Sequence, residues 1–174
     1  MVQNNPPESL DWSSLGNIAL GRPNLGEFTR LEVYRLMQYS LREEMERLLG
    51  REQTSRIFYQ AGYKAGLAFH KEFLSQIDLL DNFIQRLQNA LREMKIGVMH
   101  VEEADLKAGR IVLTISEDLD CSGLPESGEA LCTFDEGFIA GVLESYAGRP
   151  FRVREVDCWC LGKRTCRFVA EVTA

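Results

Sequence analysis

The stretch REVDCWCLGKRTCRFVAEV, residues 154–172, decides the fold of the C-terminal part of this chain. Two runs rich in β-branched and apolar residues flank a Gly-Lys turn, a pattern that predicts a β-hairpin. Cys158, Cys160 and Cys166, three of the five cysteines of the chain, fall within this hairpin. A disulfide, a metal site, a reactive thiol and ordinary core packing are all compatible with such a group of thiols.

The composition narrows these choices. With 174 residues, 45% of them hydrophobic and 26% charged, the chain has the make-up of one globular domain. A formal net charge of −6 argues against nucleic-acid binding, which depends on Lys and Arg contacts to phosphates. No apolar run approaches the roughly 20 residues of a membrane span, and the polar start MVQNNPPES lacks the features of a signal peptide. We therefore predict a cytoplasmic protein, in which clustered thiols are more often metal ligands or catalytic groups than disulfides.

The N-terminal half is predicted to be an arm followed by three helices. Residues 1–25 contain three of the five prolines and predict a loosely ordered arm, which leaves 26–174 as a single domain. Helical periodicity then runs over residues 28–50, 54–74 and 81–97. In the first of these helices one apolar stripe is expected, formed by Leu31, Tyr34, Met37, Leu41, Met45 and Leu48.

Local signals refine two of these helices. Thr29 and Glu32 have the spacing of a capping box at the start of the first helix. Gly62 and Gly66 are four residues apart in the second helix, so they share a face on which another element could approach closely.

The pattern changes near Gly97. Two strands are predicted within residues 97–119, a loop over 121–128, a fourth helix over 129–148, and the hairpin over 151–158 and 165–172. The element order is therefore ααα-ββ-α-ββ. This order predicts an α+β fold, in which the N-terminal helices pack with a small, mostly antiparallel sheet.

A metal site follows from placing the thiols on these elements. Cys132 at the start of the fourth helix could meet Glu155, Cys158 and Cys166 of the hairpin, and three thiolates with one carboxylate suit a closed tetrahedral Zn²⁺ site. Glu155 and Cys158 differ by three positions, so a bulge or a strand end is required between them. Cys160 and Asp157 remain alternative ligands.

The same residues carry a resemblance. The segment from Cys121 to Phe168, with Gly137–Phe138 in its helix and the E-x-x-C and C-x7-C spacings of its hairpin, resembles the 4-vinyl-reductase domain family. It is similar to the sensor domain of phenol-responsive transcription activators, and distantly to subunits of the TRAPP transport complex. The resemblance places the zinc-bearing part at about residues 97–172 and implies a structural zinc held by Cys132, Glu155, Cys158 and Cys166. It leaves Cys121 and Cys160 outside the site.

The resemblance also implies a cavity for a hydrophobic small molecule, possible classes being aromatic compounds and tetrapyrroles. The Trp–His pair that binds the phenolic hydroxyl in the phenol sensors is not reproduced, because this chain has no Trp between Trp12 and Trp159. Ordinary core packing is the competing interpretation of every candidate for the cavity lining. These candidates are Tyr59, Tyr63, Phe69, Phe83, Met99, His100, Phe134 and Phe138.

Three functions are compatible with these features. The first is a sensor or carrier that binds a ligand and forms a homodimer through its N-terminal helices, as the resemblance implies. The second is an accessory subunit in porphyrin vinyl reduction; an enzyme acting alone is disfavoured because neither a G-x-G-x-x-G fingerprint after a strand nor a P-loop is present. The third is a structural interaction module without a ligand.

Overall fold

The computed structural model describes residues 11–173, so the first ten residues of the predicted N-terminal arm lie outside the described part. Residues 11–25 of this arm contain a 3₁₀ turn, Trp12–Leu15, and the short helix α1, Ile18–Gly21. The indole ring of Trp12 packs edge-on against Phe69 and Phe73.

The expected alternation of elements is confirmed, in the order α2 (Leu31–Leu49), α3 (Arg51–Phe69), α4 (Leu80–Glu93), β1 (Val98–Asp105), β2 (Arg110–Ser116), α5 (Thr133–Ala147), β3 (Phe151–Asp157) and β4 (Cys166–Val172). A π-helical turn, His70–Leu74, follows α3. The four strands form one antiparallel sheet with the order β1-β2-β4-β3. The α+β class predicted from the sequence is therefore correct.

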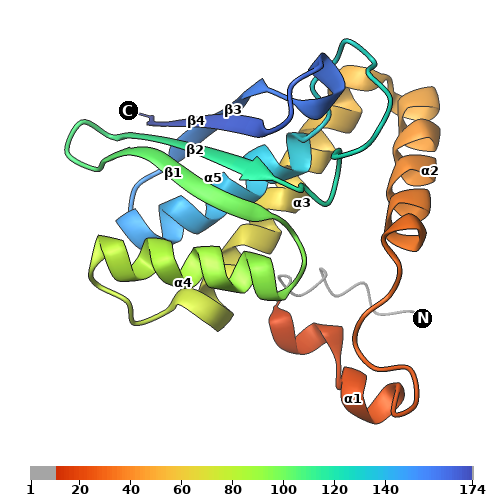
Figure 1. Ribbon diagram of the computed structural model, residues 1–174, viewed down its shortest axis with the longest axis horizontal. Helices are drawn as coiled ribbons and strands as arrows, with labels where there is room; N and C mark the ends of the chain where they lie inside the picture. The colour runs from red at the N-terminus through yellow and green to blue at the C-terminus, as the bar shows by residue number, and fades with distance from the viewer. Residues whose placement is uncertain (1–10, 174) are drawn as a thin grey trace, which may run out of the picture.

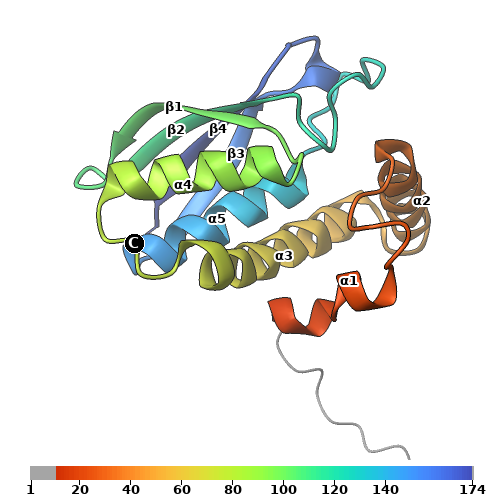
Figure 2. The same cartoon turned by 60° about the horizontal axis from the view of Figure 1, so that its bottom comes forward.

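The helices are stacked on one face of the sheet. Figure 2 shows α4 and α5 beneath the strands, with α3 below α5, whereas α2 stands apart at the end of α3. Figure 1 shows the same separation of α2 from the layers. The hydrophobic core lies between the sheet and the helices α4 and α5, and it includes Phe83, Leu113, Val142 and Phe168.

The close approach expected at Gly62 and Gly66 occurs between α3 and α5. A Cβ atom at Gly62 would lie 2.0 Å from the backbone oxygen of Phe134, and one at Gly66 would lie 2.2 Å from that of Phe138. Gly137 and Gly141 of α5 face the backbone of α3 in the same way. Only glycine permits this separation of two backbones.

The surroundings of α2 differ from the prediction in two respects. The helix begins at Leu31 without a side-chain cap, so the capping box of Thr29 does not form, and Glu32 pairs with Arg30 instead. The predicted apolar stripe is largely exposed, and the residues of α2 that are buried are Gln38 and Arg42. The reason is that α2 is attached to the protein by polar side chains, described below, and not by its apolar face.

Candidate functional site

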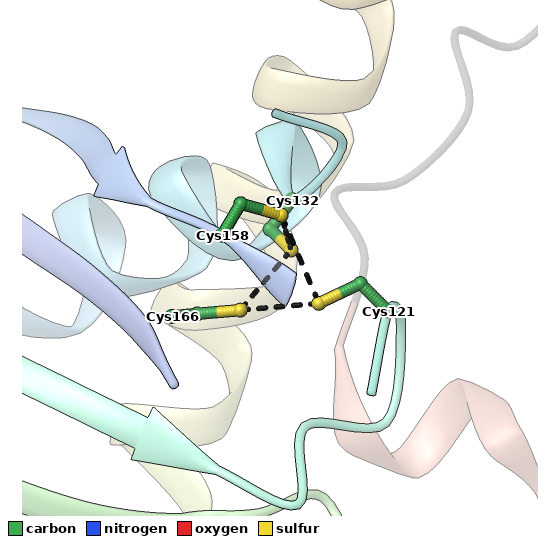
Figure 3. Close-up of side chains that lie close together, drawn as sticks. All are labelled: Cys121, Cys132, Cys158 and Cys166. Atoms are coloured by element: carbon green, nitrogen blue, oxygen red, sulfur yellow. Dashed lines mark hydrogen bonds between the residues drawn. The ribbon is translucent and has the colours of Figure 1, made fainter. Parts of the chain in front are cut away.

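Four buried cysteines meet at one end of the sheet. Cys121, Cys132, Cys158 and Cys166 have their sulfur atoms within 4.8 Å of one another, and Figure 3 shows the four side chains pointing toward a common centre. The Sγ atoms of Cys132 and Cys166 are 3.8 Å apart, and Cys158 Sγ lies 3.9 Å from the Sγ atoms of Cys132 and Cys121. Cys121 Sγ and Cys166 Sγ are separated by 3.1 Å. We call these four residues the thiol cluster.

The dimensions of the thiol cluster fit a tetrahedral metal ion. Zinc–sulfur bonds of about 2.3 Å in a tetrahedron give sulfur–sulfur edges of about 3.8 Å. Three of the four separations given above, at 3.8 to 3.9 Å, agree with that edge. Four soft sulfur donors around one point are the donor set that structural zinc prefers.

Each cysteine is placed by a different local structure. Cys132 is the residue that precedes the first turn of α5, and Cys166 is the first residue of β4. Cys158 follows β3 directly, and the pairing of β3 with β4 shifts register between Glu155 and Asp157. The bulge and the strand end that the sequence required are therefore both present.

The loop after β2 delivers Cys121. The carboxylate of Asp118 accepts hydrogen bonds from the backbone N–H groups of Asp120 and Cys121, at 2.8 and 3.0 Å. This turn directs the thiol of Cys121 inward, where its residue is fully buried. The sequence analysis left Cys121 out of the site, and the only signal for it was a cysteine in the polar CSG loop.

Glu155, the predicted fourth ligand, lies beside the thiol cluster. Its Oε2 atom accepts a hydrogen bond from the backbone N–H of Cys132 at 3.2 Å, and its Oε1 atom is buried without a hydrogen-bond partner among the described residues. Burial, together with the charge of Cys158, raises the pKa of Glu155 to about 8. The carboxylate is thus close enough to position the cluster through Cys132.

The two alternative ligands lie elsewhere. Cys160 is buried in the 3₁₀ turn after Cys158, where burial raises its pKa to about 11, and its carbonyl accepts hydrogen bonds from Ser127 and Gly128. The Asp157 carboxylate lies 3.9 Å from the ammonium group of Lys163. Neither residue belongs to the thiol cluster.

A cavity lies on the other side of the first turns of α5. Its outer part, of about 150 Å³, is lined by Trp12, Tyr34, Ala65, Phe69, Met94, Ile96, Leu119, Phe134, Asp135 and Phe138. Its inner part, of about 20 Å³, lies between α4, α5 and the strands β1 and β2, and it shares Ile96, Asp135 and Phe138 with the outer part.

Half of the predicted lining residues reach this cavity. Phe69, Phe134 and Phe138 line its outer part, and Met99 and Phe138 line its inner part. The other four predicted residues lie elsewhere, as the next paragraph describes.

Phe83 stacks on the ring of Tyr146 within the core, at 3.9 Å between ring centroids. Tyr59 and Tyr63 lie where α3 crosses α5, and His100 is exposed on β1. The sequence analysis missed Asp135, and the available signal was an acidic residue between Phe134 and Phe138 in a largely apolar helix.

The first turns of α5 connect the thiol cluster to the cavity. Cys132 precedes the helix, while Phe134, Asp135 and Phe138 in its first two turns line the cavity. Any metal bound by Cys132 would therefore fix the position of the cavity wall. No helix in the described part of the chain is long and apolar enough to cross a membrane.

Comparisons with known proteins agree with this architecture. Residues 111–172 match the model of the vinyl-4-reductase domain family. The chain is 28% identical over 145 residues to an uncharacterized protein of Methanocaldococcus jannaschii, a match that covers 83% of this chain and 78% of that protein.

Three solved structures have a similar fold. The phenol-responsive sensory domain of the transcription activator PoxR, solved with phenol, has a TM-score of 0.60 at 14% identity over 84% of this chain and 76% of that chain. A vinyl-4-reductase family protein from Methanocaldococcus jannaschii has a TM-score of 0.62 at 18% identity, covering 86% and 85% of the two chains. Trafficking protein particle complex subunit 3 from Naegleria fowleri, covalently bound to palmitic acid, has a TM-score of 0.60 at 17% identity, covering 83% and 95%.

The matched span begins in β2 and ends in β4, and it includes all four residues of the thiol cluster. Residues 111–172 of this chain are therefore a domain of the vinyl-4-reductase family, in agreement with the resemblance seen in the sequence.

Proposed function

We propose that this protein is a sensor or carrier domain that binds a small hydrophobic molecule in the cavity beside α5, and that a structural zinc ion braces the cavity wall. The observation that carries this proposal is the first turn of α5, which begins at a cysteine of the thiol cluster and continues into the cavity lining. The PoxR sensory domain, which has a similar fold, was solved with phenol.

Zinc would be held by Cys121, Cys132, Cys158 and Cys166, with Cys121 in the position that the sequence analysis gave to Glu155. A site closed by four protein ligands leaves no position open for substrate, so the ion stabilises the fold. Glu155 then serves as an outer partner that accepts the N–H of Cys132.

A homodimer formed through α2 is part of this proposal. Val33, Leu36, Met37 and Leu41 expose between 55% and 74% of their surface along this helix. Apolar rows of this kind on a globular domain usually mark an interaction surface. In a two-fold symmetric pair, the row on one copy would meet the same row on the other, which covers both at once.

The test of this function is a ligand titration with a metal assay. The protein purified with equimolar zinc should bind one-ring aromatic probes such as toluene or phenol, detected by calorimetry. Removal of the metal with a chelator should weaken this binding and lower the melting temperature together, because the wall of the cavity loses its anchor. Binding that survives complete zinc removal would contradict the brace, and failure of the zinc-loaded protein to bind any such probe would contradict the ligand-binding function.

A further inference from the structure

Asp135 is the one carboxyl group that lines the cavity within the described residues. The side chains around it are aliphatic, aromatic or sulfur-containing. The Oδ2 atom of Asp135 is buried and has no hydrogen-bond partner among the described residues. An unpaired buried polar atom costs about 1 to 3 kcal/mol relative to a paired one, so such a group is expected to have a partner that the protein chain does not supply.

The neighbouring polar groups are committed elsewhere. Tyr34, which also lines the cavity, donates its hydroxyl hydrogen to Asp120 at 2.8 Å. The carboxylate of Asp118 lies within 4.8 Å of that of Asp135 and accepts the two backbone N–H groups of the Cys121 turn. The sulfur of Cys132 lies within the same distance. An ionised carboxylate has no hydrogen to donate, and a thiolate that binds a metal has lost its own, so neither provides a donor to Asp135.

Burial raises the pKa of Asp135 well above its usual range, because the apolar cavity wall and the neighbouring carboxylates disfavour its charged form. Both forms of a carboxyl group keep an oxygen that can accept a hydrogen bond. A ligand that supplies a donor would therefore pair this group whether or not it is ionised.

We propose that Asp135 is the specificity-determining residue of the cavity and that it accepts a hydrogen bond from a ligand of about one ring in size carrying one donor group, a hydroxyl or an amine. This inference rests on the function proposed above. The outer cavity, at about 150 Å³, has the size of an engineered protein cavity that holds benzene. A tetrapyrrole is several times larger, so the proposal restricts the ligand to single-ring compounds or aliphatic molecules of the same bulk.

The location of Asp135 gives such a ligand a defined orientation. The carboxyl group lies where the outer and inner parts of the cavity meet, because Asp135 lines both. A donor group at this point would leave the apolar body of the ligand against Phe69, Phe134 and Phe138. One convergent polar group in an apolar pocket is the usual arrangement by which small-molecule sites fix orientation.

The experiment compares three probes of similar shape: phenol, which can donate a hydrogen bond, anisole, which can only accept one, and toluene, which does neither. Calorimetry on the zinc-loaded wild type should show phenol bound about tenfold more tightly than either of the others, the upper range for one hydrogen bond. In Asp135→Leu, which keeps the bulk but removes the acceptor, this preference should disappear while toluene binds at least as tightly as before.

Two further variants keep the test decisive. Glu144→Leu makes the same kind of substitution on α5 at a residue outside the cavity lining, and it should retain the preference for phenol. Asp135→Asn preserves shape and a carbonyl acceptor, so an intermediate preference is expected, and it replaces the Leu variant if that chain does not fold.

The outcomes separate this inference from the proposed function. Equal affinity of the wild type for the three probes, tighter binding of anisole than of phenol, or a phenol preference that survives undiminished in Asp135→Leu or Asp135→Asn would overturn the role of Asp135 and leave the cavity as a binding site. Absence of binding by all three probes would overturn the ligand-binding function and this inference with it.

Discussion

Cys121 reaches the thiol cluster because of one side chain that is not a cysteine. Asp118 accepts the N–H groups of Asp120 and Cys121, which closes a turn that points the thiol inward. Asp120 in the same turn accepts hydrogen bonds from Tyr34 and Gln38 of α2, at 2.8 and 2.9 Å. The loop is therefore held from both sides, and buried carboxylates that are hydrogen-bonded in this way stabilise a single loop conformation.

Substitutions of single residues distinguish the two possible fourth ligands. Cys121→Ser should reduce bound zinc from about one per chain to a small fraction and lower the melting temperature, because a closed site loses one of four ligands. Glu155→Gln should retain the metal, since an amide oxygen can still accept the N–H of Cys132. Metal content by mass spectrometry and a thermal melt of each variant provide the measurement.

Cys160→Ser is the matched control, because Cys160 is as deeply buried as the others but lies outside the cluster. This variant should keep its zinc. Loss of zinc in Glu155→Gln, with retention in Cys121→Ser, would instead establish the three-cysteine, one-glutamate set that the sequence predicted.

At the scale of elements, the crossing of α3 and α5 is a close contact between two helix backbones, and glycines on both helices make it possible. Phe134 and Phe138, whose backbone oxygens face Gly62 and Gly66, are also cavity-lining residues. The separation of the two helices therefore sets the position of the cavity wall. A side chain at either glycine would push α5 away from α3, because a backbone cannot yield as a flexible side chain does.

Gly66→Ala should destabilise the fold by about 3 kcal/mol, the upper range for an overpacked contact. The added Cβ would lie 2.2 Å from the backbone oxygen of Phe138. Urea denaturation gives the free energy of unfolding, with Gly21→Ala as the control. Gly21 has no atom within 4 Å of an added Cβ, so its variant should lie within about 0.5 kcal/mol of the wild type. Equal stability of the two variants would contradict the close packing of α3 and α5.

As a whole, the molecule has a packed body and one helix attached through polar contacts. Arg35 of α2 donates to the carbonyl oxygens of Leu119 and Ser122, at 2.8 and 2.9 Å, and Arg42 donates to that of Leu131. These bonds tie α2 to the loops that carry Cys121 and Cys132. The helix stands apart from the other layers (Figure 1), and its apolar row is exposed.

The oligomeric state tests whether a second copy covers this row. Leu36, exposed over 74% of its surface, can be replaced by Glu without loss of core packing. The wild type should be a dimer by light scattering, and the double variant Leu36→Glu/Leu41→Glu a folded monomer, because burying these charges in the interface is unfavourable.

Leu79→Glu, a substitution at another exposed leucine just before α4, should leave the dimer intact. A wild type that is monomeric at high concentration would contradict self-association through α2.

Sequence periodicity was sufficient for the elements and for most of the cysteine positions. The strands and the hairpin follow from alternation of apolar residues, and the helices follow from the three- and four-residue spacing, since these patterns reflect local backbone geometry. The bulge near Glu155 could be inferred in the same way, because Glu155 and Cys158 cannot share a face of a regular strand.

The sequence by itself determined the α+β order, the close approach at Gly62 and Gly66, and the grouping of Cys132, Cys158 and Cys166. Only the tertiary structure decided which face of α2 is buried, that Cys121 joins the cluster, and that Asp135 lines the cavity. The physical reason is range. Helix and strand patterns depend on neighbours a few residues apart, whereas these three features depend on hydrogen bonds and packing between segments far apart in the chain, such as α2 with the loop after β2.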